Sequence, residues 1–242
     1  MNDELMLLNG GNYKINDKIY IKQPTLNDIF IYGEQEYFSM ISALVSIPSD
    51  MKSVLFDMGV DYENISDFEF FIWLCKKFDS SITNILFGEQ LNFEKMNVTN
   101  NPKNQEIILT NATTLNDIEN SIVIDFYIYN LMVSYIRKMH GFTKKVEKAG
   151  NEYTKNILIE EDRENRKNNA DFKSFLKPLI ISMVNCADFP YDFNNVWNLP
   201  ISVFIESVQQ VQKYKNAGHL LQGIYSGSID GTKLNKDNLR WI

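Results

Sequence analysis

The sequence holds few side chains of the types that perform acid–base, nucleophilic or metal chemistry. Its two histidines, His140 and His219, have no Cys or carboxylate at metal-ligand spacing. His140 lies at the predicted end of a helix, where the dipole favours imidazolium, and His219 begins a shorter helix. There is no Gly-x-Ser-x-Gly pattern, locally supported Cys–His pair or nucleotide signature. We therefore predict no catalytic, cofactor or metal site and a protein that is not an enzyme, although a site assembled from distant residues stays open.

The remaining candidate groups have simpler structural interpretations. Cys75 and Cys186 lie far apart in apolar helical contexts, which favours buried thiols in a reducing compartment over a disulfide or metal site. Glu160 and Glu161 are neighbours on a charged helix, so they do not face each other as a paired-carboxylate site requires. No strand precedes the glycines of residues 223–231, which we interpret as turn and helix-end glycines rather than a phosphate loop.

Charge and hydropathy exclude two classes of partner. The net charge of -7 argues against nucleic acid, which requires clustered Lys and Arg. The first residues lack the basic and apolar regions of a signal peptide, and the apolar runs are shorter than a membrane span. We expect a cytoplasmic protein with no membrane partner.

The sequence pattern of residues 1–142 predicts an α+β block with hairpins. Residues 5–8 and 13–21 flank Asn-Gly-Gly-Asn and suggest a hairpin. The first predicted helix runs from a capping box of Thr25 and Asp28 to about Ser46, and a second runs from after Ser49 to Gly59. A third begins at a capping box of Ser66 and Glu69 and ends at Phe78. Two more are predicted over 81–87 and from Asp125 to Gly141. A second hairpin of 91–96 and 106–110 turns at Pro102, with a third strand near 122–124 that could join both hairpins in one sheet.

Two further parts follow. Residues 143–169 mix both charge signs at helical spacing and predict a solvated helical connector, and 170–242 predict a helical block. In that block we predict a first helix whose apolar face includes Phe172 and Phe175 and which Pro178 should kink or restart. A second predicted helix begins at Pro200 and should end before 216–218. The last predicted elements are a helix over 219–225, and a final turn over 236–241 that Asn235 caps and that folds Leu239 and Trp241 back onto the block. The predicted class is mainly α with a small antiparallel β component.

An aromatic loop before the last helices is the best candidate for an exposed binding surface. Its side chains are difficult to assign to a helix face, which favours exposure. The predicted partner-binding residues are Phe189, Tyr191, Phe193 and Trp197.

Several stretches resemble tail morphogenesis proteins of tailed phages and prophages of Gram-positive hosts, most closely the tail assembly chaperones. The ending Tyr225-Ser-Gly-x-x-Asp230, with Trp241 close behind, is similar to the close of such chaperones. The other stretches that carry the resemblance are Ile21–Ile29, Gly33–Tyr37, Pro48–Gly59, Ser66–Glu69, Tyr135–Phe142 and Trp197–Pro200.

The resemblance implies binding rather than catalysis. A tail assembly chaperone coats the helical tape measure protein in the host cytoplasm until tail tube subunits displace it, and it requires no cofactor. The resemblance carries over no individual contact residue. A virion component, such as a tail-completion or connector protein that forms a ring or tube, is the alternative, and a homo-oligomer stays open.

Overall fold

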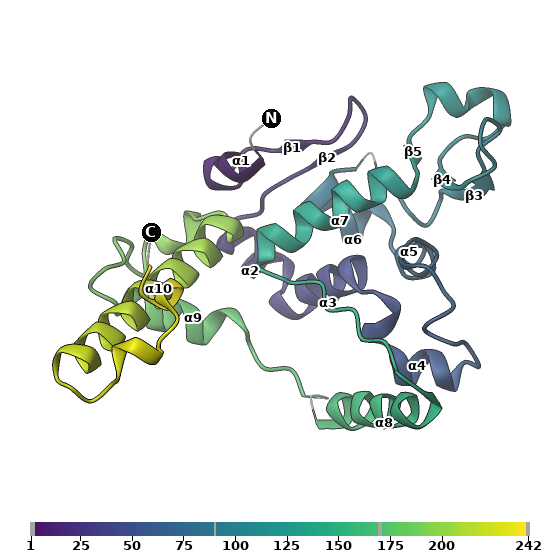
Figure 1. Ribbon diagram of the computed structural model, residues 1–242. Helices are drawn as coiled ribbons and strands as arrows, with labels where there is room; N and C mark the ends of the chain where they lie inside the picture. Colours follow the sequence, from purple (N-terminus) through teal and green to yellow (C-terminus); the bar gives the residue numbers. More distant parts are fainter. Residues whose placement is uncertain (1–2, 90, 169–170, 241–242) are drawn as a thin grey trace.

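The computed structural model describes residues 3–89, 91–168 and 171–240 and is mainly helical, with two small antiparallel sheets (Figure 1). This confirms the predicted α+β class. Within the described ranges, no helix combines the length and hydropathy needed to cross a bilayer.

The N-terminal segment begins with a helix rather than a strand. Helix α1 covers Asp3–Asn9, and the short pair β1 at Tyr13–Lys14 and β2 at Tyr20–Ile21 follows it. Pairing of 5–8 with 13–21 was therefore a wrong prediction, since both strands lie within 13–21. The buried Gln23 explains the difference, because its amide donates to the carbonyls of Met6 and Gly11 at the end of α1.

Residues 26–45 form two helices, not the single helix predicted. Helix α2 covers Leu26–Tyr32 and α3 covers Glu34–Val45, close to the predicted end. The capping box of Thr25 and Asp28 is present, as predicted. Gly33 interrupts the helix at φ +103°, a conformation that L side chains rarely adopt.

Three shorter helices follow in the next part of the chain. They are α4 at Lys52–Asp57, α5 at Asp67–Cys75 and α6 at Ser80–Phe87, after a 3-10 turn η1 at Pro48–Asp50. The capping box of Ser66 and Glu69 is confirmed, and Gly59 has the predicted positive φ of +74°. Helix α5 ends three residues before Phe78, because the amide of Phe78 bonds the Cys75 carbonyl in a tighter turn.

The second sheet consists of three antiparallel strands in the order β3-β4-β5. The strands are β3 at Asn97–Asn100, β4 at Ile107–Thr110 and β5 at Val123–Ile124. The turn around Pro102 and the third strand are confirmed. The first strand lies after, not within, 91–96, because Leu91, Phe93 and Met96 are buried in the main core. The two sheets stay separate, so the prediction of one joined sheet is wrong.

Helix α7, Phe126–His140, lies between α3 and the long helix α10, Ile201–Tyr225 (Figure 1). Asp125 caps α7, and Gly141 ends it in the left-handed conformation, as predicted. Helix α10 continues through the predicted break at 216–218. Ala217, within that predicted break, is buried.

The end of the chain folds back along α10. Turns η4 at Gly231–Lys233 and η5 at Lys236–Leu239 follow, and Asn235 caps η5, as predicted. Turn η5 lies against α10, and the Leu239 side chain is half-buried. The other residue expected to fold back, Trp241, lies outside the described residues.

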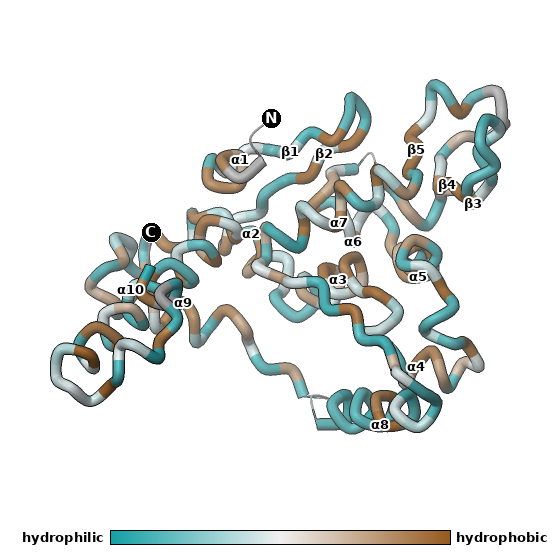
Figure 2. The backbone as a smooth tube through the Cα atoms, viewed as in Figure 1, coloured by the Kyte–Doolittle hydropathy of each residue, from teal (hydrophilic) through white to brown (hydrophobic). Residues whose placement is uncertain are grey.

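Helices α8 and α9 differ in character. Helix α8, Glu152–Asn168, is the predicted solvated helix and is mostly hydrophilic in Figure 2. Helix α9, Leu176–Val184, places Pro178 in its first turn, so Pro178 neither kinks nor restarts a helix. Phe172 and Phe175 precede α9 and are exposed, not part of its apolar face as predicted.

Two clusters of buried side chains hold the molecule together. The main core includes Leu7, Met132 and Phe204, and so draws on both 1–142 and 170–242. A second, small cluster consists of Leu55, Tyr62, Phe70 and Ile159. The division into three parts stays a prediction.

Candidate partner-binding site

The four aromatic residues of the predicted binding loop lie at different depths. Phe193 is 52% exposed, whereas Tyr191 and Trp197 are half-buried. Phe189 is buried at 7%, with its ring 6.3 Å from that of Phe204. The expectation of exposure is therefore wrong for Phe189, whose side chain is a core contact, while a binding role for the other three stays a prediction.

Phe193 and Trp197 meet at an apolar groove of about 300 Å³ between α2 and α9. Most of its lining is aliphatic or aromatic, and we call it the α2–α9 groove. Its walls are Leu26, Ile29, Phe30, Glu34, Ser174, Leu176, Lys177, Ile180, Ile181, Phe193 and Trp197. Such a lining binds apolar side chains rather than charged ligands.

Backbone hydrogen bonds bring Trp197 beside α2, although the two are far apart in sequence. Trp197 lies in the 3-10 turn η3, Val196–Asn198. The amide of Leu26 donates to the carbonyl of Leu199 at 3.0 Å, and the amide of Ile201 donates to that of Pro24 at 2.9 Å. As a result the Trp197 ring lies 5.7 Å from the exposed ring of Phe30.

Glu34 lines the groove and bonds the start of α9. Its carboxylate accepts the hydroxyl of Ser174 at 2.7 Å and the amide of Leu176 at 2.8 Å, at the start of α9. A carboxylate is favourable at the positive end of a helix dipole. Glu34 therefore positions the groove wall, and the exposed Lys177 is the cationic side chain of the lining.

The sequence analysis did not identify Phe30 or Ile181 as part of a binding surface. A signal for the first was present, because three consecutive apolar residues, 29–31, cannot all face the core on one helix. Ile29 is fully buried, whereas Phe30 and Ile31 are 69% and 72% exposed. No comparable signal marks Ile181.

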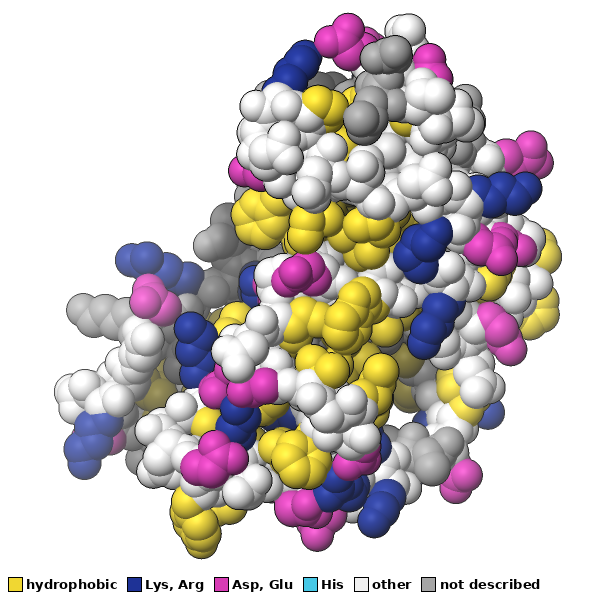
Figure 3. All heavy atoms as spheres, turned by 90° about the vertical axis from the view of Figure 1, so that its right-hand side faces the viewer, with side chains coloured by type: hydrophobic (Ala, Val, Ile, Leu, Met, Phe, Trp, Pro, Cys, Tyr) yellow, Lys and Arg dark blue, Asp and Glu magenta, His cyan; other side chains and the backbone are white. Residues whose placement is uncertain are grey.

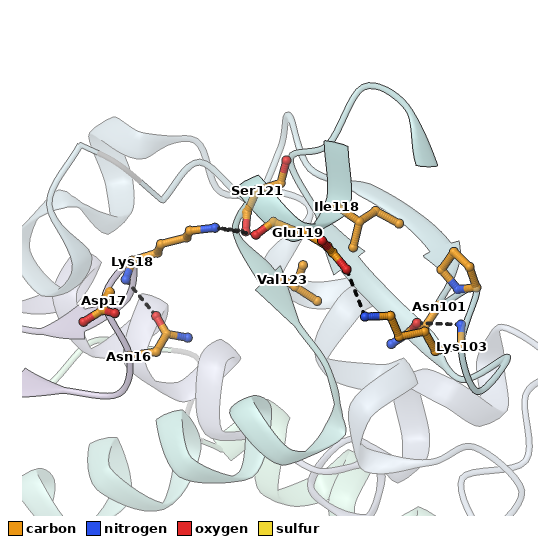
Figure 4. Close-up of a pocket in the computed structure, with 10 residues that line it drawn as sticks. Asn16, Asp17, Lys18, Asn101, Lys103, Ile118, Glu119, Ser121 and Val123 are labelled. Carbon is orange, nitrogen blue, oxygen red and sulfur yellow. Dashed lines mark hydrogen bonds and ion pairs between the residues drawn. The ribbon is translucent and has the colours of Figure 1, made fainter. Parts of the chain in front are cut away.

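A second cavity, of about 670 Å³, is polar and lies between the β1–β2 turn, the β3–β4 turn and the 3-10 turn η2, Leu115–Asn120 (Figure 4). Lys18 donates to the carbonyls of Glu119 and Ser121 at 3.1 and 3.0 Å. The amino group of Lys103 pairs with the Glu119 carboxylate at 3.0 Å. Both amino groups are thus engaged by residues that line the cavity. The contacts of Lys18 link the β1–β2 turn to the segment before β5, whereas the Lys103–Glu119 pair lies within the second sheet's own connections.

His140 is buried and neutral, in contrast to the predicted imidazolium. Its Nδ1 lies 2.7 Å from the Ile136 carbonyl, which can only accept, so Nδ1 carries the proton. Nε2 then accepts from the Tyr37 hydroxyl at 2.7 Å. Burial lowers the pKa of His140 to about 4, because desolvation of the ring outweighs its hydrogen bond with the Ile136 carbonyl.

The other candidate groups lie apart from one another. Cys75 and Cys186 are free and buried, as predicted, and burial raises the pKa of the Cys75 thiol. His219 and Glu161 are exposed, and Glu160 pairs with Arg163 on its own helix. Among the described residues, no three His, Cys, Asp or Glu side chains are grouped to hold a metal.

Comparison of the chain with protein-family models, with curated protein sequences and with solved structures gave no match.

Proposed function

We propose that this chain is a non-enzymatic phage tail assembly protein, a chaperone that holds an apolar helical segment of the tape measure protein in the α2–α9 groove. The observation that carries the proposal is the groove itself, an apolar hollow with exposed aromatic rings at its edge. Trp197, which belongs to one of the stretches that carry the sequence resemblance, forms part of its wall. The resemblance supplies the biological setting and the groove supplies the means of binding.

The size of the groove suits one face of a client helix. About 300 Å³ accommodates a few side chains, which matches apolar residues at i, i+3 and i+4 on one face. Phe30 and Phe193 offer aromatic rings of the kind that dominate binding energies. A groove that takes only a few side chains gives moderate affinity, and tail tube subunits can then displace the chaperone.

Copurification with the tape measure protein of the same phage tests the proposal. Phe30→Ser and Phe193→Ser remove exposed rings from the groove, and Phe56→Ser removes a similarly exposed ring from α4 as the matched control. Each groove variant should weaken the complex about tenfold or more, while the control should not. Equal affinity of all three variants would exclude the groove, and the lack of any complex would exclude the chaperone.

Mass spectrometry of purified particles tests the second part of the proposal. A chaperone acts in the host cytoplasm and leaves before the tail is complete, so the chain should be missing from virions. Several copies per particle would instead assign it to the tail as a completion or connector component.

A further inference from the structure

Helix α8 is attached to the molecule outside the main core. It lies along α4 at one edge, and non-helical chain leads into it from α7 (Figure 1). Every residue of α8 is described, and Ile159 is the one among them that is buried. Ile159 inserts between Leu55, Tyr62 and Phe70 in the second cluster. A single aliphatic side chain therefore provides the apolar anchor of a 17-residue helix.

Charge complementarity surrounds this anchor. The amino group of Lys155 lies 2.6 Å from the Asp61 carboxylate, and a guanidinium nitrogen of Arg163 lies 2.5 Å from that of Asp57. Arg166 also donates to the carbonyl of Asp50 at 2.6 Å. In these pairs the body of the molecule contributes Asp57 and Asp61, and α8 contributes Lys155 and Arg163. In the opposite sense, Asp162 of α8 accepts from the amide and the hydroxyl of Ser53 at 2.9 and 2.5 Å.

These contacts follow one face of α8. Lys155, Ile159, Arg163 and Arg166 are spaced by four, four and three residues, which places them on the same side of a helix. Figure 3 views the molecule from the α4 and α5 side and shows acidic and basic side chains intermixed in its lower part. Ion pairs at such a solvated rim add little net stability and are screened by salt.

The site beneath α8 contains an unsatisfied polar atom. Tyr62 is 4% exposed, and its hydroxyl is the one buried side-chain N or O atom among the described residues that has no hydrogen-bond partner. Lys155 lies over the Tyr62 ring, 5.4 Å from the centroid, but does not bond the hydroxyl. Because a buried hydroxyl without a partner is unfavourable, α8 is an imperfect occupant of this site.

We infer that this α8 site, formed by Leu55, Tyr62 and Phe70 with the acidic rim of Asp57 and Asp61, is a second helix-binding site that α8 covers reversibly. Its other occupant is an amphipathic helix of a partner protein, with Lys or Arg on both sides of one aliphatic residue at the spacing of α8. The apolar floor takes the aliphatic side chain, and the acidic rim selects the basic flanks. The α8 site is separate from the α2–α9 groove and does not depend on the function proposed above.

A peptide with the sequence of residues 152–168 is the probe for the α8 site. In the full chain, Ile159→Asp should displace α8, whereas Ile157→Asp, on the 40% exposed neighbour, is the matched control. The Ile159→Asp chain should bind the peptide at least about tenfold more tightly than the wild type or the control. The same peptide with Ile159→Asp should not bind. Equal binding by all chains, or binding by none, would overturn the proposal.

Hydrogen exchange of the full chain separates displacement of α8 from loss of the fold. Ile159→Asp should remove protection from residues 152–168 and leave that of α7 unchanged. Loss of protection in both helices would show that α8 belongs to the folding core and would overturn the proposal. Tyr62→Phe removes the unsatisfied hydroxyl and should slow exchange in α8 about threefold or more. Faster exchange would contradict the argument from Tyr62.

Discussion

Helices α7 and α8 have similar lengths but are held by different forces. Helix α7 has 15 residues, seven of them buried, whereas α8 has 17 residues and one that is buried. Each fully buried aliphatic side chain contributes about 1.5–3 kcal/mol, and an exposed ion pair contributes about 0–1 kcal/mol. The comparison shows that helical character in a sequence does not indicate how firmly a helix is held.

The largest expected effect is a difference in unfolding free energy between the same truncation made in α7 and in α8. Ile136 of α7 and Ile159 of α8 are 1% and 2% exposed. Ile136→Ala should lower the free energy of unfolding by about 2–5 kcal/mol, because the cavity opens in the main core. Ile159→Ala should lower the free energy of global unfolding by a smaller amount, since α8 can detach before the rest of the molecule unfolds. Urea unfolding measures both, and an equal cost would place α8 in the same cooperative unit as α7.

Acid should lower the free energy of unfolding through His140, a buried residue of α7. Its pKa is about 4 in the folded chain against an ordinary 6.5, so the unfolded state takes up the proton first. The stability that His140 contributes is complete above pH 6.5 and is lost as the pH falls towards about 4. From about pH 7 to about pH 5 the loss is about 2 kcal/mol.

Urea unfolding at both pH values measures the effect of His140. The His140→Gln variant should lack this part of the pH dependence, while His219→Gln, at an exposed position, should keep it. Identical pH profiles for the two variants would contradict the prediction.

The smallest effect is expected from removing one charged side chain of α8. Arg163→Gln removes the contacts with both Asp57 and Glu160 and should lower the free energy of unfolding less than either isoleucine truncation does. Hydrogen exchange in 152–168 should accelerate in low salt, and the difference from wild type should shrink at about 1 M salt. A difference that is independent of salt would mean that Arg163 acts by packing, not by charge.

Local sequence rules predicted the starts of several helices. Thr25, Ser66, Asp125 and Asn235 cap the elements that they were expected to cap, because a capping side chain bonds amides only two or three residues away. The wrong predictions concern elements whose state depends on distant partners. Residues 5–8 became helical, and the distant Gln23 bonds the Met6 carbonyl among them.

The candidate binding surface was predicted in part. The aromatic loop contributes Phe193 and Trp197 to the α2–α9 groove, but Phe189 fills the core against Phe204. The opposite wall, with Phe30, comes from a helix more than 150 residues earlier in the chain. No local pattern indicates that two such segments meet.

The sequence by itself determined the α+β class, the buried thiols and the positions of the caps, since these depend on composition and on contacts within a few residues. Tertiary structure alone decided that His140 is neutral, that the groove lies between α2 and α9, and that α8 is anchored by one buried side chain within a rim of ion pairs. The reason is physical: desolvation, cavity shape and ion pairing depend on which distant side chains become neighbours.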